Sequence, residues 1–444
     1  MRARRAESHA IGVGRRTLNT RRRRTEPLDD VTLTQKVQSE LFRRAGIDKG
    51  HISVNAEDGV VFLRGTLEHT ADIERLGEAA RAIAGVREVE NPEDPHGAIL
   101  VVVPHGMVIG WDIGGVNTKV ARVDDGGIVD ACGRPYELQR APGALTSLLR
   151  ELSAAVGAQS PVRHAVTMTA ELSQMFRTKR EGVAFVLDAV EAAFPADDIC
   201  VFAVDGRFLS PGGARREPLA VAAANWSATA HVVARRHPNV VLVDVGTTTA
   251  DVIPIVDGAV VARGRTDPDR LASGELVYTG ALRTPVEAIV RDVPYAAGTA
   301  TVSAEGFALS GDVHVWLGSL DTRDYTVPAP DGRQVSRELC GERLARVVCA
   351  DLDLIDEAGI TRIATAVAGA QVAHVAAAIA RVASRHPVLR TAIVTGLGAF
   401  VAEAAARQAG LDVLSLDAEQ GRAAARCAPA AAVALLLSEA VAHA

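Results

Sequence analysis

Two segments of this chain place a carboxylate, glycines and hydroxyl or amide side chains at matching positions. Residues 112–119 read DIGGVNTK and residues 244–251 read DVGTTTAD. Each segment follows a strand-like apolar run and leads into a second run that ends in Asp-Gly, at residues 125–126 and 257–258. The leading aspartates, the glycines two positions later and the closing glycines are all 132 residues apart. This constant offset predicts a duplicated unit.

The two segments have the chemistry of paired phosphate-binding hairpin loops. Glycine lets the backbone approach an anion, and backbone N–H groups and threonine hydroxyls donate to phosphate oxygens. Asp112 and Asp244 would end their strands beside those oxygens, where a carboxylate can hold hydrated Mg²⁺. Ordinary hairpins also carry Asp-Gly turns, but the matched pair favours a diphosphate site. The expected phosphate contacts are Gly114, Gly115, Asn117, Thr118, Lys119, Gly246, Thr247, Thr248 and Thr249.

A strand-to-helix junction near the end of the chain adds a further glycine-rich candidate. Residues 391–400 read TAIVTGLGAF, in which Gly396 and Gly398 would let a flat or charged group press on the backbone at a helix N-terminus. No Gly-x-x-x-x-Gly-Lys-Ser/Thr run surrounds any of the four lysines, so the sequence excludes a P-loop.

Polar residues in two other segments are candidates for lining a cleft. Taken alone, each is better explained as a turn residue, so this interpretation depends on the whole cluster. The segments SGELVYTGALRTPVE and SAEGFALSGDVHVW supply Glu275, Tyr278, Thr279, Arg283, Thr284, Glu305 and Asp312.

The overall composition is that of an ordinary globular protein of about two to four domains, with 444 residues, 48% apolar and 23% charged. Five scattered cysteines without Cys-x-x-Cys spacing argue against a disulfide framework and favour a reducing, cytoplasmic setting. The twelve histidines form no metal-binding pattern. No uninterrupted apolar run approaches the ~20 residues that span a bilayer, and residues 428–437 predict a buried alanine-rich helix.

The net charge of -6 conceals a basic N-terminus. Residues 1–25 hold nine arginines and one glutamate, a net charge of +8, which leaves about -14 for the remainder. Such a run can bind nucleic acid or anionic lipid, but terminal runs of this kind are more often disordered. We therefore predict a disordered basic tail over residues 1–29 and no nucleic-acid partner.

The next segment, residues 30–97, predicts a small αββαβ domain. Residues 31–44 and 70–84 have helical spacing, residues 51–66 alternate like a hairpin that turns at Asp58-Gly59, and residues 86–91 predict a strand. With the stretches VVFLRGTLEH and AIAGVREVEN, this segment resembles the BON domain. The resemblance implies contact with phospholipid surfaces or partner proteins, and we favour a protein–protein module.

From residue 107 onward, strands alternate with helices in a βββαβαβα plan that occurs twice, over residues 107–240 and 241–444. The first copy predicts helices at residues 142–155, 181–194 and 219–236 and strands at residues 163–168 and 199–204. With the facing hairpins and the late glycine pair, this plan resembles the duplicated α/β fold of actin, the sugar kinases and the heat-shock ATPases.

A narrower resemblance covers residues 107 to about 440. This region is similar to the hydantoinase/oxoprolinase-related branch of tetrahydromethanopterin-linked one-carbon metabolism. The resemblance implies a transferase of methanofuran biosynthesis, because archaeal relatives join an aminomethylfuran diphosphate to the phenol of γ-glutamyltyramine. The similar stretches are IGWDIGGVNTK, VDVGTTTADVIP, SGELVYTGALRTPV, EGFALSGDVHVWLG, DGRQVSRELCGERLARVVCADLD and VTGLGAF.

The resemblance implies roles for the candidate residues. Asp112 and Asp244 would serve catalysis through Mg²⁺ while pyrophosphate leaves, and Glu275 would orient the phenolic acceptor. The base for the phenol is left open among Glu275, Glu305 and Asp312. Arg343 and Arg346, on a helix predicted at residues 338–348, are candidates for an anionic carboxylate of the acceptor or for a surface salt bridge.

Two other functions are compatible with the same residues. One is an ATP-dependent activity, either hydantoinase/oxoprolinase-like or a small-molecule kinase, for which ATP would be the ligand. The other is a non-catalytic, nucleotide-gated scaffold in which the BON-like module recruits partners. Consumption of ATP separates the first from a transferase, and absence of turnover identifies the second.

Overall fold

The computed structural model describes residues 29–45, 52–57, 60–67, 70–90, 100–102, 106–158 and 162–442. The chain forms two compact units, Met1–Leu100 and Val101–Ala444. All but the last residue of the predicted basic tail, and the predicted turn at residues 58–59, lie outside the described residues.

The smaller unit has the predicted αββαβ order. Its antiparallel pair β1–β2 is joined by β3, parallel to β2, and β4 also pairs with β2. Leu33, Val37 and Leu41 recur every four residues and are fully buried, which places one face of α1 on the sheet. The elements are α1 (Asp30–Ala45), β1 (Ser53–Glu57), β2 (Val60–Leu67), α2 (Thr70–Arg81), β3 (Glu88–Glu90) and β4 (Leu100–Val102).

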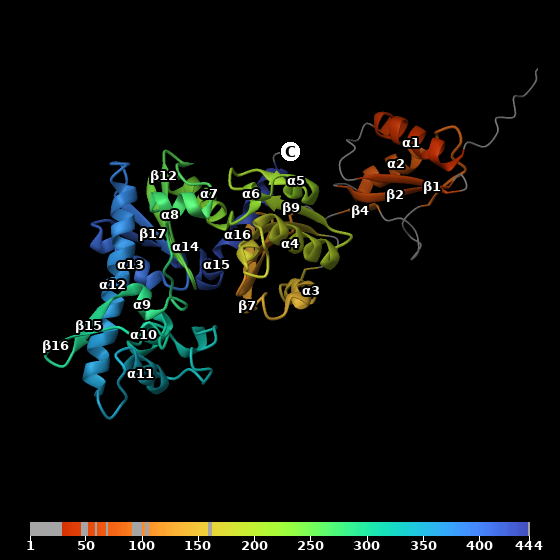
Figure 1. Cartoon of the computed structure of the whole chain (residues 1–444). Helices are drawn as coiled ribbons and strands as arrows, with labels where there is room; N and C mark the ends of the chain where they lie inside the picture. Colours follow the sequence, from red (N-terminus) through yellow and green to blue (C-terminus); the bar gives the residue numbers. More distant parts are fainter. Residues whose placement is uncertain are drawn as a thin grey trace, which may run out of the picture. The chain divides into compact units, whose positions relative to one another are not determined.

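The first half of the larger unit is a sheet of order β10-β9-β8-β5-β6-β7, of which Figure 1 labels β9 and β7. Its central strand β5 is antiparallel to β6 and parallel to β8. The strands are β5 (Val108–Ile113), β6 (Asn117–Asp124), β7 (Gly127–Pro135), β8 (Arg163–Met168), β9 (Asp198–Phe202) and β10 (Phe208–Leu209). The helices α3 (Leu145–Ala155) and α4 (Lys179–Ala193) follow β7 and β8, as predicted.

The second half repeats this plan in a sheet of order β13-β12-β11-β17-β18, with β14 paired to β12. Here β11 is antiparallel to β12 and parallel to β17. The Asp-Gly turns after β6 and β12 also match, with φ of 48° and 76° in the first and 51° and 76° in the second. The predicted duplicated actin- and sugar-kinase-like fold is confirmed. The strands are β11 (Val240–Val245), β12 (Ala250–Val256), β13 (Ala259–Val260), β14 (Leu276–Val277), β17 (Thr391–Thr395) and β18 (Asp412–Ser415).

Two helices, α7 (Asn225–Arg236) and α16 (Ala428–Ala442), connect the halves. Trp226 and Val233 of α7 belong to the core against the second sheet, whereas Ala228 belongs to the core against the first. The predicted alanine-rich helix is α16, which packs on β5, β6, β8 and α7. The end of the chain therefore returns to the first half, so a single division at residue 240 separates the halves incompletely.

The helix predicted over residues 219–236 is broken in the structure. It forms α6 (Pro218–Val221) and α7, which begins only at Asn225. The interruption arises because Ala222 bridges to Met168 at the end of β8, and the N–H of Ala223, at φ 51°, donates to the Met168 carbonyl. Pairing with the end of the interior strand β8 overrides the local helical pattern.

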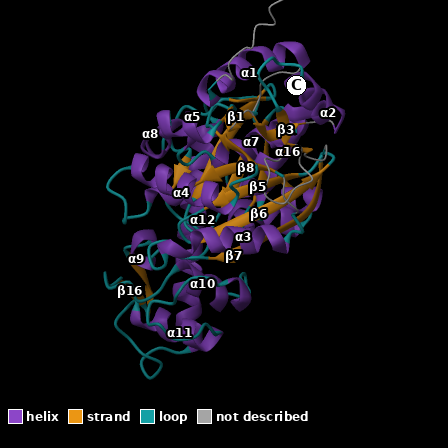
Figure 2. Ribbon diagram, turned by 90° about the vertical axis from the view of Figure 1, so that its right-hand side faces the viewer, coloured by secondary structure: helices purple, strands orange, loops and turns teal. Residues whose placement is uncertain are grey.

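A group of short elements is inserted between β13 and the long helix α12 (Glu357–Ala383). In Figure 2, β5, β6 and β8 lie side by side, and α9, α10, α11 and β16 gather below them. The inserted elements are α8 (Asp267–Ser273), α9 (Val286–Ile289), β15 (Asp292–Tyr295), β16 (Gly298–Thr301), α10 (Ser310–Trp316) and α11 (Arg337–Arg346). The remaining helices are α5 (Pro211–Arg216), α13 (Ala399–Gln408), α14 (Leu416–Gln420) and α15 (Arg422–Arg426).

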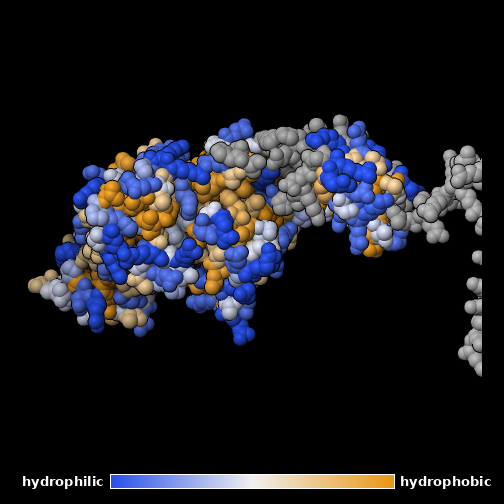
Figure 3. All heavy atoms as spheres, turned by 90° about the horizontal axis from the view of Figure 1, so that it is seen from above, coloured by the Kyte–Doolittle hydropathy of each residue, from blue (hydrophilic) through white to orange (hydrophobic). Residues whose placement is uncertain are grey.

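By length and composition alone, α12 could cross a membrane. It packs instead against α10 and α13. Its Gln371 side chain is buried and donates a hydrogen bond to Thr279. We therefore interpret α12 as a core helix. On the face of the larger unit seen in Figure 3, hydrophilic side chains are interspersed with apolar patches.

Replacing Gly110 with alanine should destabilise the larger unit by about 1–3 kcal/mol, because a methyl group there overpacks the contact between β5 and α16. A Cβ at Gly110 would lie 1.9 Å from the Ala430 carbonyl oxygen. Gly143→Ala is the matched control, since a Cβ at Gly143 meets nothing within 4 Å. Urea unfolding measures both, and equal unfolding free energies in the two variants would contradict this packing.

Candidate functional site

The two predicted loops have the same backbone hydrogen bond at the same offset in the chain. The Gly114 N–H donates to the Asn117 carbonyl at 2.9 Å, and the Gly246 N–H donates to the Thr249 carbonyl at 2.9 Å. The loops also meet, because the Asn117 side-chain amide donates to the Thr247 hydroxyl at 3.4 Å. The structure therefore brings together two segments that are far apart in the sequence.

The residues that lead into the two loops differ in charge. In the first hairpin, Asp112 lies opposite Lys119 and forms an ion pair with it at 3.5 Å. In the second hairpin, Asp244 lies opposite Asp251, which is bound at 2.8 Å by the buried guanidinium of Arg270. Lys119 and Asp251 are equivalent positions, so the second copy has an acid where the first has a base.

The carboxylates at the loops interact electrostatically. The pKa of Asp244 is raised to about 7, first by burial and then by the charges of Asp251 and Asp112, against the attraction of Lys119. Burial also raises the pKa of Asp112, against the attraction of Lys119. Burial disfavours the charge of Lys119, but Asp112, Cys427 and Asp244 act in the opposite direction and raise its pKa. Asp112, Lys119 and Asp244 are therefore close enough to influence one another's charge.

The carboxylates of Asp112 and Asp244 are suitable ligands for a hydrated divalent cation. Asp112 Oδ1 is buried and accepts no hydrogen bond from the described residues, and Lys119 and Arg270 face three carboxylates. Among the described residues, no group of three or more His, Cys, Asp or Glu is placed to hold a metal by itself. Two carboxylates supplemented by water and phosphate oxygens are the environment that Mg²⁺ prefers.

The glycine pair after β17 lies against the second hairpin. A Cβ at Gly396, which has φ 92°, would be 2.3 Å from Asp244 Oδ1. The Gly398 N–H donates to the Val245 carbonyl at 2.7 Å, just as the Thr169 N–H donates to the Ile113 carbonyl at 2.9 Å in the first half. The glycines therefore let the start of α13 approach the carboxylate of Asp244.

Residues 279–284 pack against the second loop and form hydrogen bonds with its backbone carbonyls. The N–H of Ala281 donates to the Gly246 carbonyl, and those of Leu282 and Arg283 donate to the Thr247 carbonyl. A Cβ at Gly280 would be 2.5 Å from the Thr248 nitrogen, so only glycine fits this contact. The segment holds the loop in place through its backbone.

A buried network on α12 continues this support. Gln371 donates to the Thr279 hydroxyl and to the Gly280 carbonyl, both at 2.8 Å, and the Gly280 N–H donates to the Thr284 hydroxyl at 2.9 Å. The Gln371 carbonyl oxygen lies 2.8 Å from His314 Nε2, and burial lowers the pKa of His314 to about 4. Thr279 and Thr284, expected to line a cleft, therefore stabilise the loop, whereas Tyr278 is exposed.

Two of the expected site residues are placed differently from the prediction. Thr118 is fully buried, because alternation along β6 points Asn117 and Lys119 to one face and Thr118 to the other. Glu275 is also fully buried, and its two oxygens accept the N–H groups of Arg263 and Gly264 at 2.8 and 2.9 Å. The geometry argues against a phosphate contact for Thr118 and an acceptor contact for Glu275.

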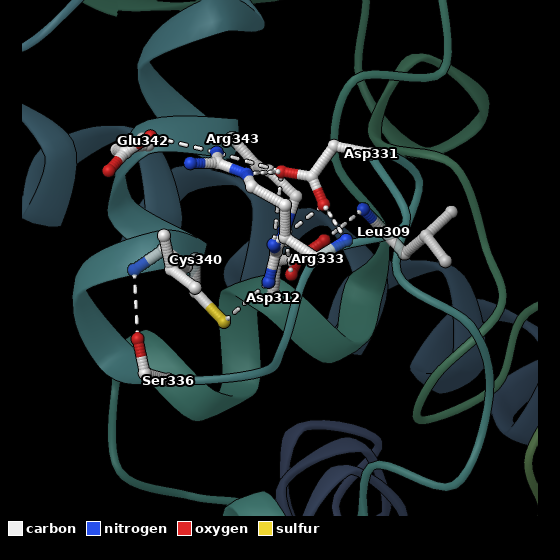
Figure 4. A network of polar contacts seen from close by, with 9 residues as sticks. Leu309, Asp312, Asp331, Arg333, Ser336, Cys340, Glu342 and Arg343 are labelled. Carbon is white, nitrogen blue, oxygen red and sulfur yellow. Dashed lines mark hydrogen bonds and ion pairs between the residues drawn. The ribbon is translucent and has the colours of Figure 1, made fainter.

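A second buried network accounts for Asp312 and Arg343 (Figure 4). The Arg343 guanidinium binds Asp312 at 2.8 Å and Asp331 at 3.1 Å, and the other Asp312 oxygen accepts the Leu309 N–H at 2.8 Å. Arg343 and Asp312 are buried, so neither the carboxylate-binding role nor the surface salt bridge expected for Arg343 matches the structure. Asp312 is likewise unsuited as a base, while Glu305 is exposed.

The sequence interpretation missed three charged residues that meet across the two halves. Glu171, in the turn after β8, is 1% exposed, and burial raises its pKa to about 7 against the attraction of Lys179. Lys179 lies 3.3 Å from Glu171 and 2.7 Å from Asp267 of α8. No short spacing in the sequence connects these residues. Asp251 and its partner Arg270 were also missed, although the constant offset from Lys119 marked Asp251.

Comparisons with known proteins bear on both units. The hydantoinase/oxoprolinase family pattern matches residues 163–440 and the BON domain pattern matches residues 29–92. The partner or lipid contact expected of the BON-like unit stays a prediction.

Two curated relatives share one name. A Methanocaldococcus jannaschii protein named (4-{4-[2-(gamma-L-glutamylamino)ethyl]phenoxymethyl}furan-2-yl)methanamine synthase is 34% identical over 334 residues, 75% of this chain and 98% of that protein. A protein of the same name from Methanococcus vannielii is 30% identical over 45% of this chain and 90% of its own length. Among solved structures, a ROK family glucokinase from Streptomyces griseus in complex with glucose and AMPPNP aligns with a TM-score of 0.40 and 15% identity, over 74% of this chain and 98% of that one.

Gly396→Ala should weaken binding of magnesium pyrophosphate about tenfold or more, because the added methyl group displaces the Asp244 carboxylate. A tenfold loss corresponds to ~1.4 kcal/mol, a modest cost for such a contact. Gly410→Ala is the matched control, since Gly410 has φ 80° but nothing within 4 Å of its Cβ position. Titration calorimetry compares the two, and an equal loss of affinity in both would attribute the effect to backbone strain alone.

Glu171→Gln should flatten the pH dependence of stability. Because the pKa of Glu171 is about 7 rather than 4.5, the native protein loses stability as pH rises from 4.5 to about 7, and the loss is complete above that. The free energy of unfolding of the variant, relative to that of the unmodified protein, should therefore be higher at pH 8 than at pH 4.5 by on the order of 3 kcal/mol. Urea unfolding at both pH values tests this, with Glu191→Gln as the control, and parallel profiles for Glu171→Gln and the unmodified protein would refute it.

Proposed function

This chain belongs to the hydantoinase/oxoprolinase family, and we propose that it is a synthase of methanofuran-type cofactor biosynthesis. The reaction joins an aminomethylfuran diphosphate to the phenol of a tyrosine- or tyramine-derived acceptor and releases pyrophosphate. The name of the relatives describes a phenoxymethylfuran, an ether between a phenol and the carbon attached to a furan. Making that ether requires a leaving group on the carbon and removal of the phenol proton.

The observation that carries this proposal is the meeting of the two loops at Asn117 and Thr247. Each loop has the same internal hydrogen bond, so both present backbone N–H groups and polar side chains to one ligand. A diphosphate is long enough to contact both loops, and preorganised donors stabilise the charge that develops on it as it leaves. Lys119, with side-chain exposure of 31%, supplies a positive charge beside the first loop.

Mg²⁺ is the cofactor proposed for this site. Asp112 and Asp244 would hold it, in part through water. A bound divalent cation would neutralise charge on the diphosphate and so improve the leaving group. The excess of buried carboxylate over cationic side chains at the loops supports this assignment.

The main alternative is an ATP-dependent kinase or hydantoinase/oxoprolinase-like activity. Incubation with the furan diphosphate distinguishes this activity from the proposed transferase. Purified protein receives the furan diphosphate, a tyramine acceptor and Mg²⁺, with and without ATP. The proposed transferase forms ether and pyrophosphate in equal amounts in both samples and consumes no ATP. Turnover only with ATP would favour a kinase or hydantoinase, and ligand binding without turnover would favour a scaffold.

Asp112→Asn should lower the rate of pyrophosphate release by about 100-fold or more, the scale seen when one preorganised electrostatic contact is removed. Asp257→Asn is the control, because Asp257 lies in the exposed Asp-Gly turn of the second hairpin, where asparagine tolerates the positive φ equally well. Rates come from a coupled pyrophosphate assay at saturating substrates. An Asp112→Asn enzyme as active as Asp257→Asn would exclude Asp112 from the site.

A further inference from the structure

The carboxylate of Glu171 is a reactive group that the diphosphate site leaves unused. Its side chain is 1% exposed, and neither oxygen accepts a hydrogen bond from the described part of the chain. Its near neighbour is the Lys179 ammonium, at 3.3 Å from Oε1. A buried carboxylate with an ion pair but no well-formed hydrogen bond costs stability, so its retention calls for an explanation.

The fold holds Glu171 next to the first phosphate loop. The turn that carries it begins where the Thr169 N–H donates to the carbonyl of Ile113, the residue after Asp112. A Cβ at Gly182 of α4 would lie 2.5 Å from the Glu171 Cα, so glycine lets the helix pack directly on this turn. The backbone of Glu171 is therefore fixed relative to the loop.

The charged groups that face Glu171 come from both halves of the larger unit. Lys179 on α4 also binds Asp267 on α8 at 2.7 Å, a shorter contact than the one to Glu171. The same α8 carries Arg270, which binds Asp251 opposite Asp244. Lys179 and Asp267 have side-chain exposures of 20% and 18%, so this ion pair reaches solvent, whereas Glu171 does not.

The segment that follows Glu171 exposes two apolar side chains. Leu172, the next residue, is 54% exposed, and Met175, four residues after Glu171, is 38% exposed. An aromatic ring could pack on such side chains while its hydroxyl points toward the acid. Approach of a phenol to Glu171 would require the Lys179 ammonium to shift toward Asp267, which it already contacts at 2.7 Å.

We propose, building on the function proposed above, that Glu171 is the general base that accepts the proton of the acceptor phenol. The phenol oxygen forms its bond to the carbon next to the furan as the bond from that carbon to the diphosphate oxygen breaks. The proton passes to a Glu171 oxygen, the electron pair leaves with pyrophosphate, and solvent later removes the proton from Glu171. Lys179 is a positioning residue, held by Asp267.

The environment of Glu171 suits this task. Burial raises the pKa of its carboxyl to about 7, although Lys179 lowers it. General bases work best when their pKa lies near the operating pH, and removing one typically costs 10² to 10⁴ in rate. A buried acid of this kind can take up a proton while the diphosphate keeps its own contacts in the two loops.

The test is Glu171→Gln in the full chain, assayed with the furan diphosphate and tyramine acceptors. We expect ether formation to slow by about 100-fold or more and to lose its rise through pH 7, while magnesium pyrophosphate binds within about twofold of normal. Fluorinated tyramines, whose phenols are more acidic, should reduce the deficit because they need less help from a base. Glu191→Gln is the matched control, because Glu191 is a half-buried glutamate on the same helix, α4, as Lys179 and has its own ion pair with Arg215.

A deficit that is the same for every acceptor, or an unchanged pH profile, would overturn the base assignment. Lys179→Met separates the two roles, since it breaks the ion pairs but keeps the carboxylate. It should retain the dependence on acceptor acidity of the unmodified enzyme. If Glu171→Gln fails to fold, Glu171→Asp replaces it, with a slower rate and a preserved pH profile expected. Lack of ether formation by the unmodified protein would instead refute the proposed function itself.

Discussion

The larger unit depends on holding several like charges close together in a poorly solvated place. The carboxylates of Asp112 and Asp251 both raise the pKa of Asp244. The cations that contact this group are Lys119, paired with Asp112, and Arg270, paired with Asp251. Such a cluster is unfavourable without compensation, because desolvation and mutual repulsion both disfavour ionised carboxylates. A ligand that brings a divalent cation and takes up the backbone donors of both loops relieves this cost. This cost supports the proposal that the site binds a ligand of linked phosphates.

The duplicated hairpin provides this arrangement with small differences between the copies. Strand pairing, loop hydrogen bond and closing turn are shared, so the backbone is the same. The equivalent residues Lys119 and Asp251 differ in sign. The first copy can attract an anion, and the second adds negative charge that only a cation or Arg270 can balance. Two similar backbones thus form one asymmetric site.

The surrounding structure keeps the loops rigid through close backbone contacts. Gly280 and Gly396 allow neighbouring segments to press on Thr248 and Asp244, where any side chain would collide. Behind them, Gln371 of α12 satisfies the buried polar groups of Thr279 and Gly280. Much of the polar content near the site, including Glu275 and Asp312, therefore serves the scaffold.

The sequence alone determined the features that depend on local spacing. The offset of 132 predicted both hairpins, their Asp-Gly turns and the duplicated fold, and helical and alternating patterns predicted the small αββαβ unit. These features can be predicted because strand alternation, turn residues and helical periodicity are patterns of residues close together in the sequence. The break between α6 and α7 was not predicted because it depends on a distant contact, the pairing of Ala222 with Met168 at the end of β8.

Only the tertiary structure decided which polar residues reach the site. Glu275 and Arg343 are as polar in sequence as Glu171 and Lys179, yet the first two find partners within their own subdomain. Asp267 reaches Lys179, the neighbour of Glu171, only because the two halves pack against each other. Burial, and with it the pKa of each acid, is a property of that packing. It cannot be assigned from the order of residues along the chain.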